Sequence, residues 1–206
     1  MDRELGLRFA EALNGMNGRE YLKSMVAFAA APTIKGKKPS SLMIFNAGGR
    51  NTMVLWRQHG AEICDIFRLE QFELKNEDTC IVVLLYRKKI LEWYVSHRRN
   101  QPFLEKMGYE FSGGLEQKLQ LLKRHFEALC PHEVGVFLGM PVEDVEGFIE
   151  HKGRNCLFCS YWKVYANRRR AELLFNAYDK ARSSMAESVL SLREDECAEL
   201  IREGVG

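Results

Sequence analysis

The sequence predicts an α+β fold, in which a small, mostly antiparallel sheet is covered by helices. Residues 63–73 and 79–86 both have the composition of strands, and the turn formers at 76–78 between them predict a hairpin. Residues 81–85 are apolar at every position, so both faces of that strand should be covered and it should be the central strand. Most of the remaining chain repeats apolar residues at helical spacing.

Composition narrows the class of protein. The chain has 206 residues with 46% hydrophobic and 28% charged content, which is ordinary for a globular protein. No apolar run approaches the roughly 18 residues of a membrane span, and the acidic N-terminus is unlike a secretory signal. The net charge of +2 gives no support to a nucleic-acid partner. The irregular spacing of the six cysteines is typical of reduced thiols, so we expect a cytoplasmic protein.

We expect one α+β domain at residues 19–182, an N-terminal extension at 1–18 and a C-terminal helical extension at 183–206. Ser183-Ser184 should cap a separate last helix. A strand near 160–165 should pair with the 63–86 hairpin, and a further strand is expected near 42–46. The expected helices are a short one within 1–18, then 19–30, 50–59, 87–97, 102–108, 114–129, 131–139, 141–153, 168–182 and 185–203.

Residues 131–165 hold the least generic chemistry of the chain. Two short helices joined at Gly139-Met140-Pro141 resemble a helix-turn-helix, a DNA-binding motif. The second helix, however, carries four acids where a DNA reader needs Arg, Lys, Asn or Gln, so we reject DNA binding. These acids are Glu143, Asp144, Glu146 and Glu150.

The same stretch resembles a bacterial family common in clostridia, the domain of unknown function 3793. The match runs through Pro131–Gly135, Phe137–Gly139, Pro141, Asp144-Val145, Gly147–Ile149, Gly153, Asn155 and Tyr161–Tyr165. The resemblance covers roughly residues 20–180, and family members tend to end soon after the helix at 168–182. The resemblance implies membership of this family, which has no established activity. Family genes often lie near flavodoxin and iron-handling genes, so the resemblance also implies an iron or redox setting, with a redox or iron-handling protein as partner.

Cys156 and Cys159 form a single C-x-x-C pair, which supplies half of a tetrahedral zinc site. His132, His151 or Cys130 could complete a zinc or iron site, and we take His132 as the third ligand. A redox dithiol would place the motif at a helix N-terminus, where the dipole lowers a thiol pKa, whereas this pair leads into an expected strand. The interpretation we favour is two small buried thiols in a turn.

Acid–base and anion-binding chemistry can also be assigned to this region. His132 with Glu133 could act as a base with a neighbouring acid, and Lys163 could join them. By strand alternation Lys163 shares a face with Tyr161 and Tyr165, which could form the floor of an anion pocket. His97 and His125 lie among charges and should be surface residues. The predicted anion ligands are Lys35, Lys38, Arg154, Asn155 and Lys163.

Two functions therefore remain. We expect a non-enzymatic cytosolic binding or accessory protein for a metal, a cofactor or an anionic metabolite in an iron or redox setting. The alternative is a small-molecule enzyme that uses His132, Glu133 and Lys163 in acid–base roles. Convergence of His132, Lys163 and the C-x-x-C pair on one cleft would favour a site in this region.

Overall fold

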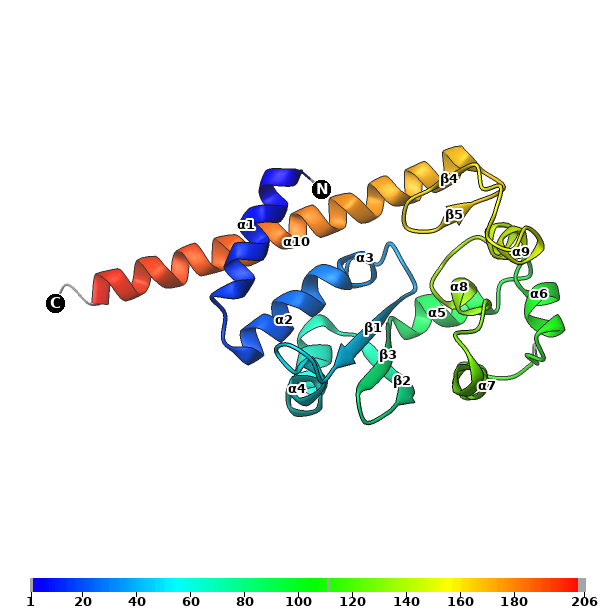
Figure 1. Ribbon diagram of the computed structural model, residues 1–206, viewed down its shortest axis with the longest axis horizontal. Helices are drawn as coiled ribbons and strands as arrows, with labels where there is room; N and C mark the ends of the chain where they lie inside the picture. The colour runs from blue at the N-terminus through cyan, green and yellow to red at the C-terminus, as the bar shows by residue number, and fades with distance from the viewer. Residues whose placement is uncertain (1, 111, 204–206) are drawn as a thin grey trace.

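The structure is a computed structural model, which describes residues 2–110 and 112–203 (Figure 1). It has the expected α+β fold, with a three-stranded antiparallel sheet and a separate two-stranded one. The elements in chain order are α1 (Arg3–Asn14), α2 (Gly18–Ala29), α3 (Ala31–Ile34), β1 (Ser40–Asn46), α4 (Thr52–Phe67), β2 (Glu70–Asn76), β3 (Cys80–Tyr86), α5 (Lys88–Val95), α6 (Gln101–Lys106), α7 (Leu115–Ala128), α8 (Val134–Phe137), α9 (Val142–Glu150), β4 (Phe158–Cys159), β5 (Lys163–Val164) and α10 (Arg168–Glu203).

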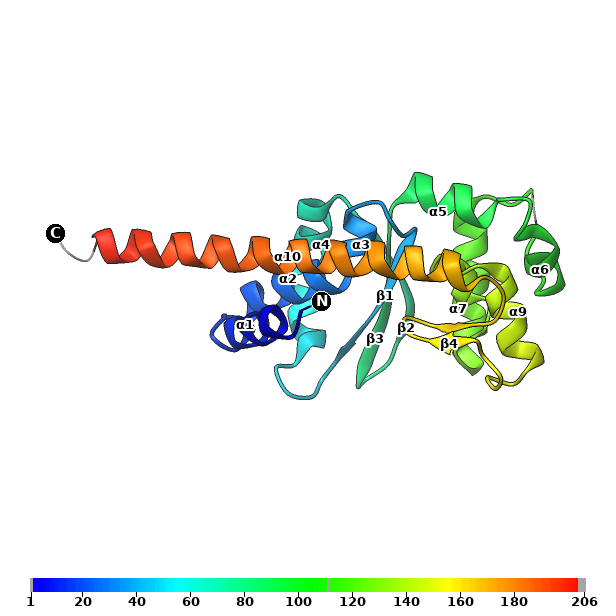
Figure 2. The ribbon, with the colours of Figure 1, turned by 90° about the horizontal axis from the view of Figure 1, so that it is seen from above.

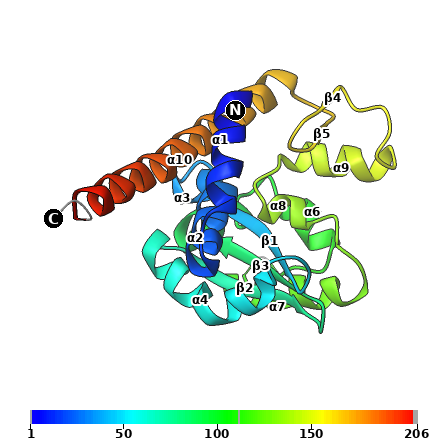
Figure 3. The same ribbon diagram turned by 60° about the vertical axis from the view of Figure 1, so that its left-hand side comes forward.

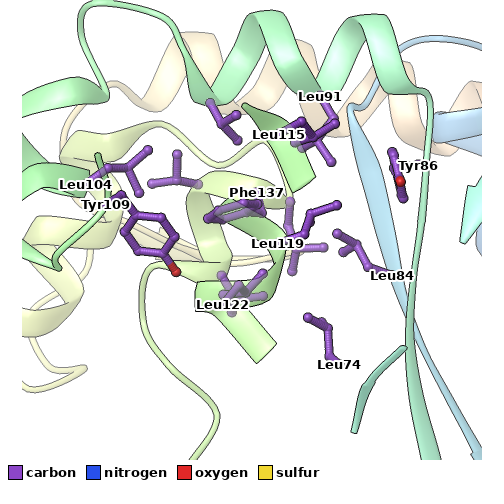
Figure 4. Close-up of a cluster of buried hydrophobic side chains, with 14 of the residues drawn as sticks. Leu74, Leu84, Tyr86, Leu91, Leu104, Tyr109, Leu115, Leu119, Leu122 and Phe137 are labelled. Atoms are coloured by element: carbon purple, nitrogen blue, oxygen red, sulfur yellow. The ribbon is translucent and has the colours of Figure 1, made fainter. Parts of the chain in front are cut away.

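The larger sheet has the strand order β1-β3-β2, so β3 is the central strand, as its apolar run predicts. Ile81, Val83 and Leu85 face α2 and α4 on one side, whereas Val82 and Leu84 face the helices from α5 to α9 on the other. The sheet therefore lies between two helical layers (Figure 3). Figure 4 shows the core on the second side, where Leu84 and Leu91 approach Phe137 and Leu119.

The predicted strand at 63–73 is wrong over its first part, because residues 63–67 belong to α4. Ile63 is buried on the same helix face as Met53 and Trp56, so the helical spacing continues past the expected end at residue 59. Arg68 adopts a left-handed φ of 53° and closes the helix. Strand β2 then begins at Glu70 and pairs with β3 as the expected hairpin partner.

The strand predicted near 160–165 does not join the larger sheet. Residues Lys163–Val164 form β5, which pairs only with β4 in a small hairpin. The backbone N–H groups of Tyr165 and Ala166, which follow β5, both donate to the Asp144 carboxylate, so they do not extend a ladder. The apolar side of the hairpin packs instead on α10, through Trp162 and its neighbours.

The predicted break at Ser183-Ser184 is also wrong, because α10 runs without interruption to Glu203. Buried residues lie on both sides of the serines, with Ala181 before them and Ala186 and Leu190 after them. The helix contacts α1, α2 and α3 along its length, and its C-terminal end projects past the rest of the chain (Figures 1 and 2). The domain boundaries expected at residues 18 and 182 stay predictions.

Candidate functional site

A cavity of about 360 Å³ lies between α8, α9 and the β4–β5 hairpin, and we call it the hairpin pocket. Most of its wall is apolar, with Phe148, Tyr161 and Trp162 as its largest side chains. Polar groups enter from the segment before α8 and from the hairpin. The pocket is lined by Cys130, Pro131, His132, Val134, Gly135, Met140, Asp144, Val145, Phe148 and residues 159–163.

Asp144 holds the hairpin against α9. Its carboxylate is buried and accepts three hydrogen bonds, from Trp162 Nε1 (2.8 Å) and from the backbone N–H groups of Tyr165 (2.8 Å) and Ala166 (3.0 Å). Multiple donors to one carboxylate offset the cost of burying its charge. Asp144 therefore fixes the position of Trp162, which forms one wall of the pocket.

A glycine allows the chain after β5 to approach α9 closely. A Cβ added at Gly147 would lie 2.6 Å from the Cβ and Cγ atoms of Tyr165. The Tyr165 ring then stacks on His151, with 5.6 Å between ring centroids and 17° between planes. His151, an expected alternative metal ligand, is thus engaged with Tyr165 and does not line the hairpin pocket.

Lys163 extends from β5 along the pocket wall. Its Nζ atom donates to the Gly153 carbonyl (2.7 Å) and lies 6.0 Å from the centroid of the Phe148 ring. No carboxylate in the described part of the chain forms an ion pair with it. The expected alternation is present, since Lys163 is half-buried while Trp162 and Val164 are buried. The ammonium group can therefore accept an external anion as partner.

His132 and Glu133 lie in different environments. The His132 ring is exposed at the pocket and packs 5.5 Å from Phe148. Glu133 is buried, and its Oε1 atom accepts a hydrogen bond from the hydroxyl of Tyr109 (3.3 Å). The same oxygen is hydrogen-bonded to Nδ1 of His125. Burial, followed by the Glu133 carboxylate, raises the pKa of Tyr109. Glu133 therefore does not join His132 and Lys163.

His125 was expected at the surface, and this expectation is wrong in one respect. The residue is half-buried and its ring is bonded to the buried Glu133. The partner is eight positions away, beyond the end of α7, so no helical spacing indicates the contact. The Tyr109–Glu133–His125 cluster is therefore a polar cluster that the sequence does not indicate.

The cysteines are only partly brought together. Cys130 and Cys159 line the hairpin pocket, whereas Cys156 is half-buried outside it, and all three are free thiols. Burial, followed by the nearby Glu133 carboxylate, raises the pKa of Cys130. Within residues 2–110 and 112–203, no group of three or more His, Cys, Asp and Glu side chains is placed to share a metal ion. The zinc or iron site of Cys156, Cys159 and His132 thus lacks an assembled ligand set there.

The predicted anion ligands are dispersed. Lys163 lines the pocket, but the other four do not. Lys35 is exposed after α3, and Arg154 and Asn155 are exposed in the turn after α9. Lys38 is half-buried, and its burial, with a smaller contribution from Arg182, lowers its pKa to about 8.

Two aromatic side chains define the pocket, and only part of their role was predictable. Phe148 was expected on the inward face of its helix, yet it lies at the pocket between His132 and Lys163. Trp162 was expected opposite Lys163, without any indication that Asp144 binds its indole N–H. The regular spacing of α9 gives a signal for Phe148, whereas the bond to Asp144 depends on long-range packing.

Fold and pocket together define a helix-rich α+β protein with a largely apolar cavity beneath a two-stranded hairpin. The chain belongs to the family described as protein of unknown function DUF3793, whose model matches residues 26–198. The match continues past residue 182, so the expectation that the family ends near there is wrong. No curated protein and no solved structure matched the chain. Among the described helices, none has the length and apolar character needed to cross a membrane.

Proposed function

We propose that this chain is a cytosolic binding protein whose hairpin pocket holds a small metabolite with an apolar ring and an anionic group. The observation that supports this proposal is the convergence of His132 and Lys163 on one mostly apolar cavity. A volume of about 360 Å³ falls within the range of small-molecule sites, which combine apolar walls with a few polar groups.

The chemistry of the wall suggests how such a ligand lies. Its ring packs between Phe148 and Trp162, and its carboxylate, phosphate or sulfonate meets the ammonium group of Lys163. His132 lies on the other side of Phe148 and adds a second donor to the anion. Lys163 already donates to the Gly153 carbonyl, which holds its side chain in place before the ligand arrives.

A direct test uses anilinonaphthalene sulfonate, a fluorescent probe with an aromatic body and one fixed negative charge. We expect saturable binding of one equivalent, with energy transfer from tryptophan. Lys163→Met should weaken binding about tenfold, which corresponds to about 1.4 kcal/mol for a lost charged hydrogen bond. The matched control is Lys152→Met, which removes an exposed ammonium group outside the pocket.

Two further measurements make the test specific. N-phenylnaphthylamine has the same aromatic body without the sulfonate, so it should bind more weakly and should not respond to Lys163→Met. Ser160→Phe adds a ring to the pocket at an exposed position and should block both probes. The proposal fails if both probes bind equally well, or if Lys152→Met and Lys163→Met have the same effect.

A metal-binding form of the proposal rests on Cys159 and His132, which line the same pocket, with Cys156 nearby in sequence. Elemental analysis and a visible spectrum of protein purified without oxygen test it. One equivalent of zinc or iron that is lost in Cys156→Ser and Cys159→Ser variants would establish it. The acid–base enzyme alternative stays a prediction, and the location of Glu133 away from the pocket gives it no added support.

A further inference from the structure

A second cavity, of about 250 Å³, lies at the start of α9 and shares no lining residue with the hairpin pocket. We call it the arginine cleft. It is bounded by the end of α5 and the turn that follows, by the start of α9 and by the first turn of α10. Its lining residues are Trp93, Tyr94, residues 97–100, residues 141–143 and Arg170.

Positive charge dominates the arginine cleft. Arg98, Arg99 and Arg170 line it, and none of their guanidinium groups has a hydrogen bond or an ion pair in the described part of the chain. Glu143 is the one carboxylate among its lining residues. One guanidinium group can donate two parallel hydrogen bonds to the oxygens of a phosphate. The cleft therefore has unused donors for a multiply charged anion.

The start of α9 adds backbone donors to the same cleft. Helix α9 has nine residues, and no side chain caps its first turn. The N–H groups of Val142 and Glu143 thus have no partner among the described hydrogen bonds, and both residues line the cleft. A helix N-terminus attracts phosphate through these donors and the helix dipole. This is a second observation, independent of the arginines, that favours an anion.

An aromatic ring borders the charged part of the cleft. Trp93 is 63% exposed, which is unusual for so large an apolar side chain, and its ring lies 5.2 Å from that of His97. The backbone at this point is well supported, since Asn100 is buried and donates to the Tyr94 carbonyl (2.8 Å). An exposed indole on a fixed helix offers a stacking surface for a flat ring system.

We propose that the arginine cleft binds a free nucleoside phosphate. Arg99, Arg170 and the start of α9 hold the phosphate groups, and the base stacks on Trp93 at the rim. The chemical class follows from the combination of unpaired guanidinium groups, uncapped backbone donors and an exposed indole within one small cavity. This site is separate from the hairpin pocket and does not depend on the proposed function.

The test is calorimetric titration of the full chain with ADP, adenosine and inorganic phosphate. We expect ADP to bind at least tenfold more tightly than either fragment. Arg99→Gln and Arg170→Gln should each weaken ADP about tenfold. Arg169→Gln is the matched control, because it removes the same charge from an exposed neighbour outside the cleft and should change affinity less than twofold.

Trp93→Leu separates stacking from charge. It should weaken ADP about tenfold and leave phosphate unchanged, and its exposed position should preserve folding. Absence of ADP binding, equal affinity for phosphate and ADP, or equal effects of Arg169→Gln and Arg170→Gln would overturn the proposal. Binding of a ribo-oligonucleotide a hundredfold more tightly than ADP would replace it with a nucleic-acid surface. Lys163→Met should leave ADP binding unchanged, so the two proposals can fail separately.

Discussion

Replacing Asp144 with alanine should destabilise the protein, because this side chain holds the β4–β5 hairpin against α9. The change leaves three donors without a partner, the buried indole N–H of Trp162 and the two backbone N–H groups after β5. An unsatisfied buried donor costs about 1–3 kcal/mol, so we assign about 2 kcal/mol to the indole and about 1 kcal/mol to each half-buried backbone group. The expected loss in the free energy of unfolding is therefore about 4 kcal/mol.

Urea denaturation followed by circular dichroism measures this loss, and a double-mutant cycle locates it. In a Trp162→Phe background the indole N–H is absent, so Asp144→Ala should cost about 2 kcal/mol less there. Glu146→Ala changes an exposed acid on the same helix and should stay within about 0.5 kcal/mol of the parent chain. A loss below about 1 kcal/mol, or an equal loss in both backgrounds, would mean that the hydrogen bond from Trp162 to Asp144 contributes little to stability.

Three further predictions concern buried groups. Glu133→Ala should cost about 2–4 kcal/mol in urea denaturation, because it removes the shared acceptor of two side chains. Gly147→Ala should cost about 1–3 kcal/mol and shift the near-ultraviolet spectrum, because the added Cβ overlaps the Tyr165 side chain. Burial lowers the pKa of Lys38 from 10.5 to about 8. Between pH 8 and pH 10.5 the folded state therefore binds fewer protons than the unfolded state. Stability should rise across that pH window, and Lys38→Met should remove this rise and stabilise the protein at pH 7 by up to about 3 kcal/mol.

Each of these predictions has an opposing result. A Glu133→Gln variant that matches Glu133→Ala would mean that the acceptor oxygen contributes little. Gly147→Ala with unchanged stability would mean that the chain after β5 moves away at no cost. For the lysine, an exposed neighbour gives the control, since Lys37→Met should keep the pH dependence of the parent chain. If Lys38→Met kept it as well, the lowered pKa of Lys38 would be wrong.

The central hairpin of the larger sheet was predictable because its signals are local. The apolar run at 81–85 requires two covered faces, and both the position of β3 and its hairpin with β2 are confirmed. The end of α4 was not predictable, because a short apolar run such as 63–67 fits a strand and a helix equally well. Serine is a good cap, so the sequence predicts a break in α10 at Ser183-Ser184, but the buried residues on both sides of the serines outweigh that preference.

The candidate site was predictable only in part. His132 and Lys163 do line one pocket, and both come from the stretch that carries the family resemblance. Lys38 is distant in sequence, and no local pattern shows that it lies beside Arg182 rather than in the pocket. The partners of Glu133 and Asp144 are set by packing between elements, which periodicity within one element does not reveal.

The packing of α10 on α1 affects when α1 can fold during synthesis. The Arg193 side chain of α10 donates to the Ala12 carbonyl, and the helix contacts α1, α2 and α3. Helix α1 is therefore synthesised well before the helix that packs against it. The sheet and its two helical layers can assemble earlier, while α1 waits for the last helix. Until α10 has been synthesised, the face of α1 that packs on it stays uncovered.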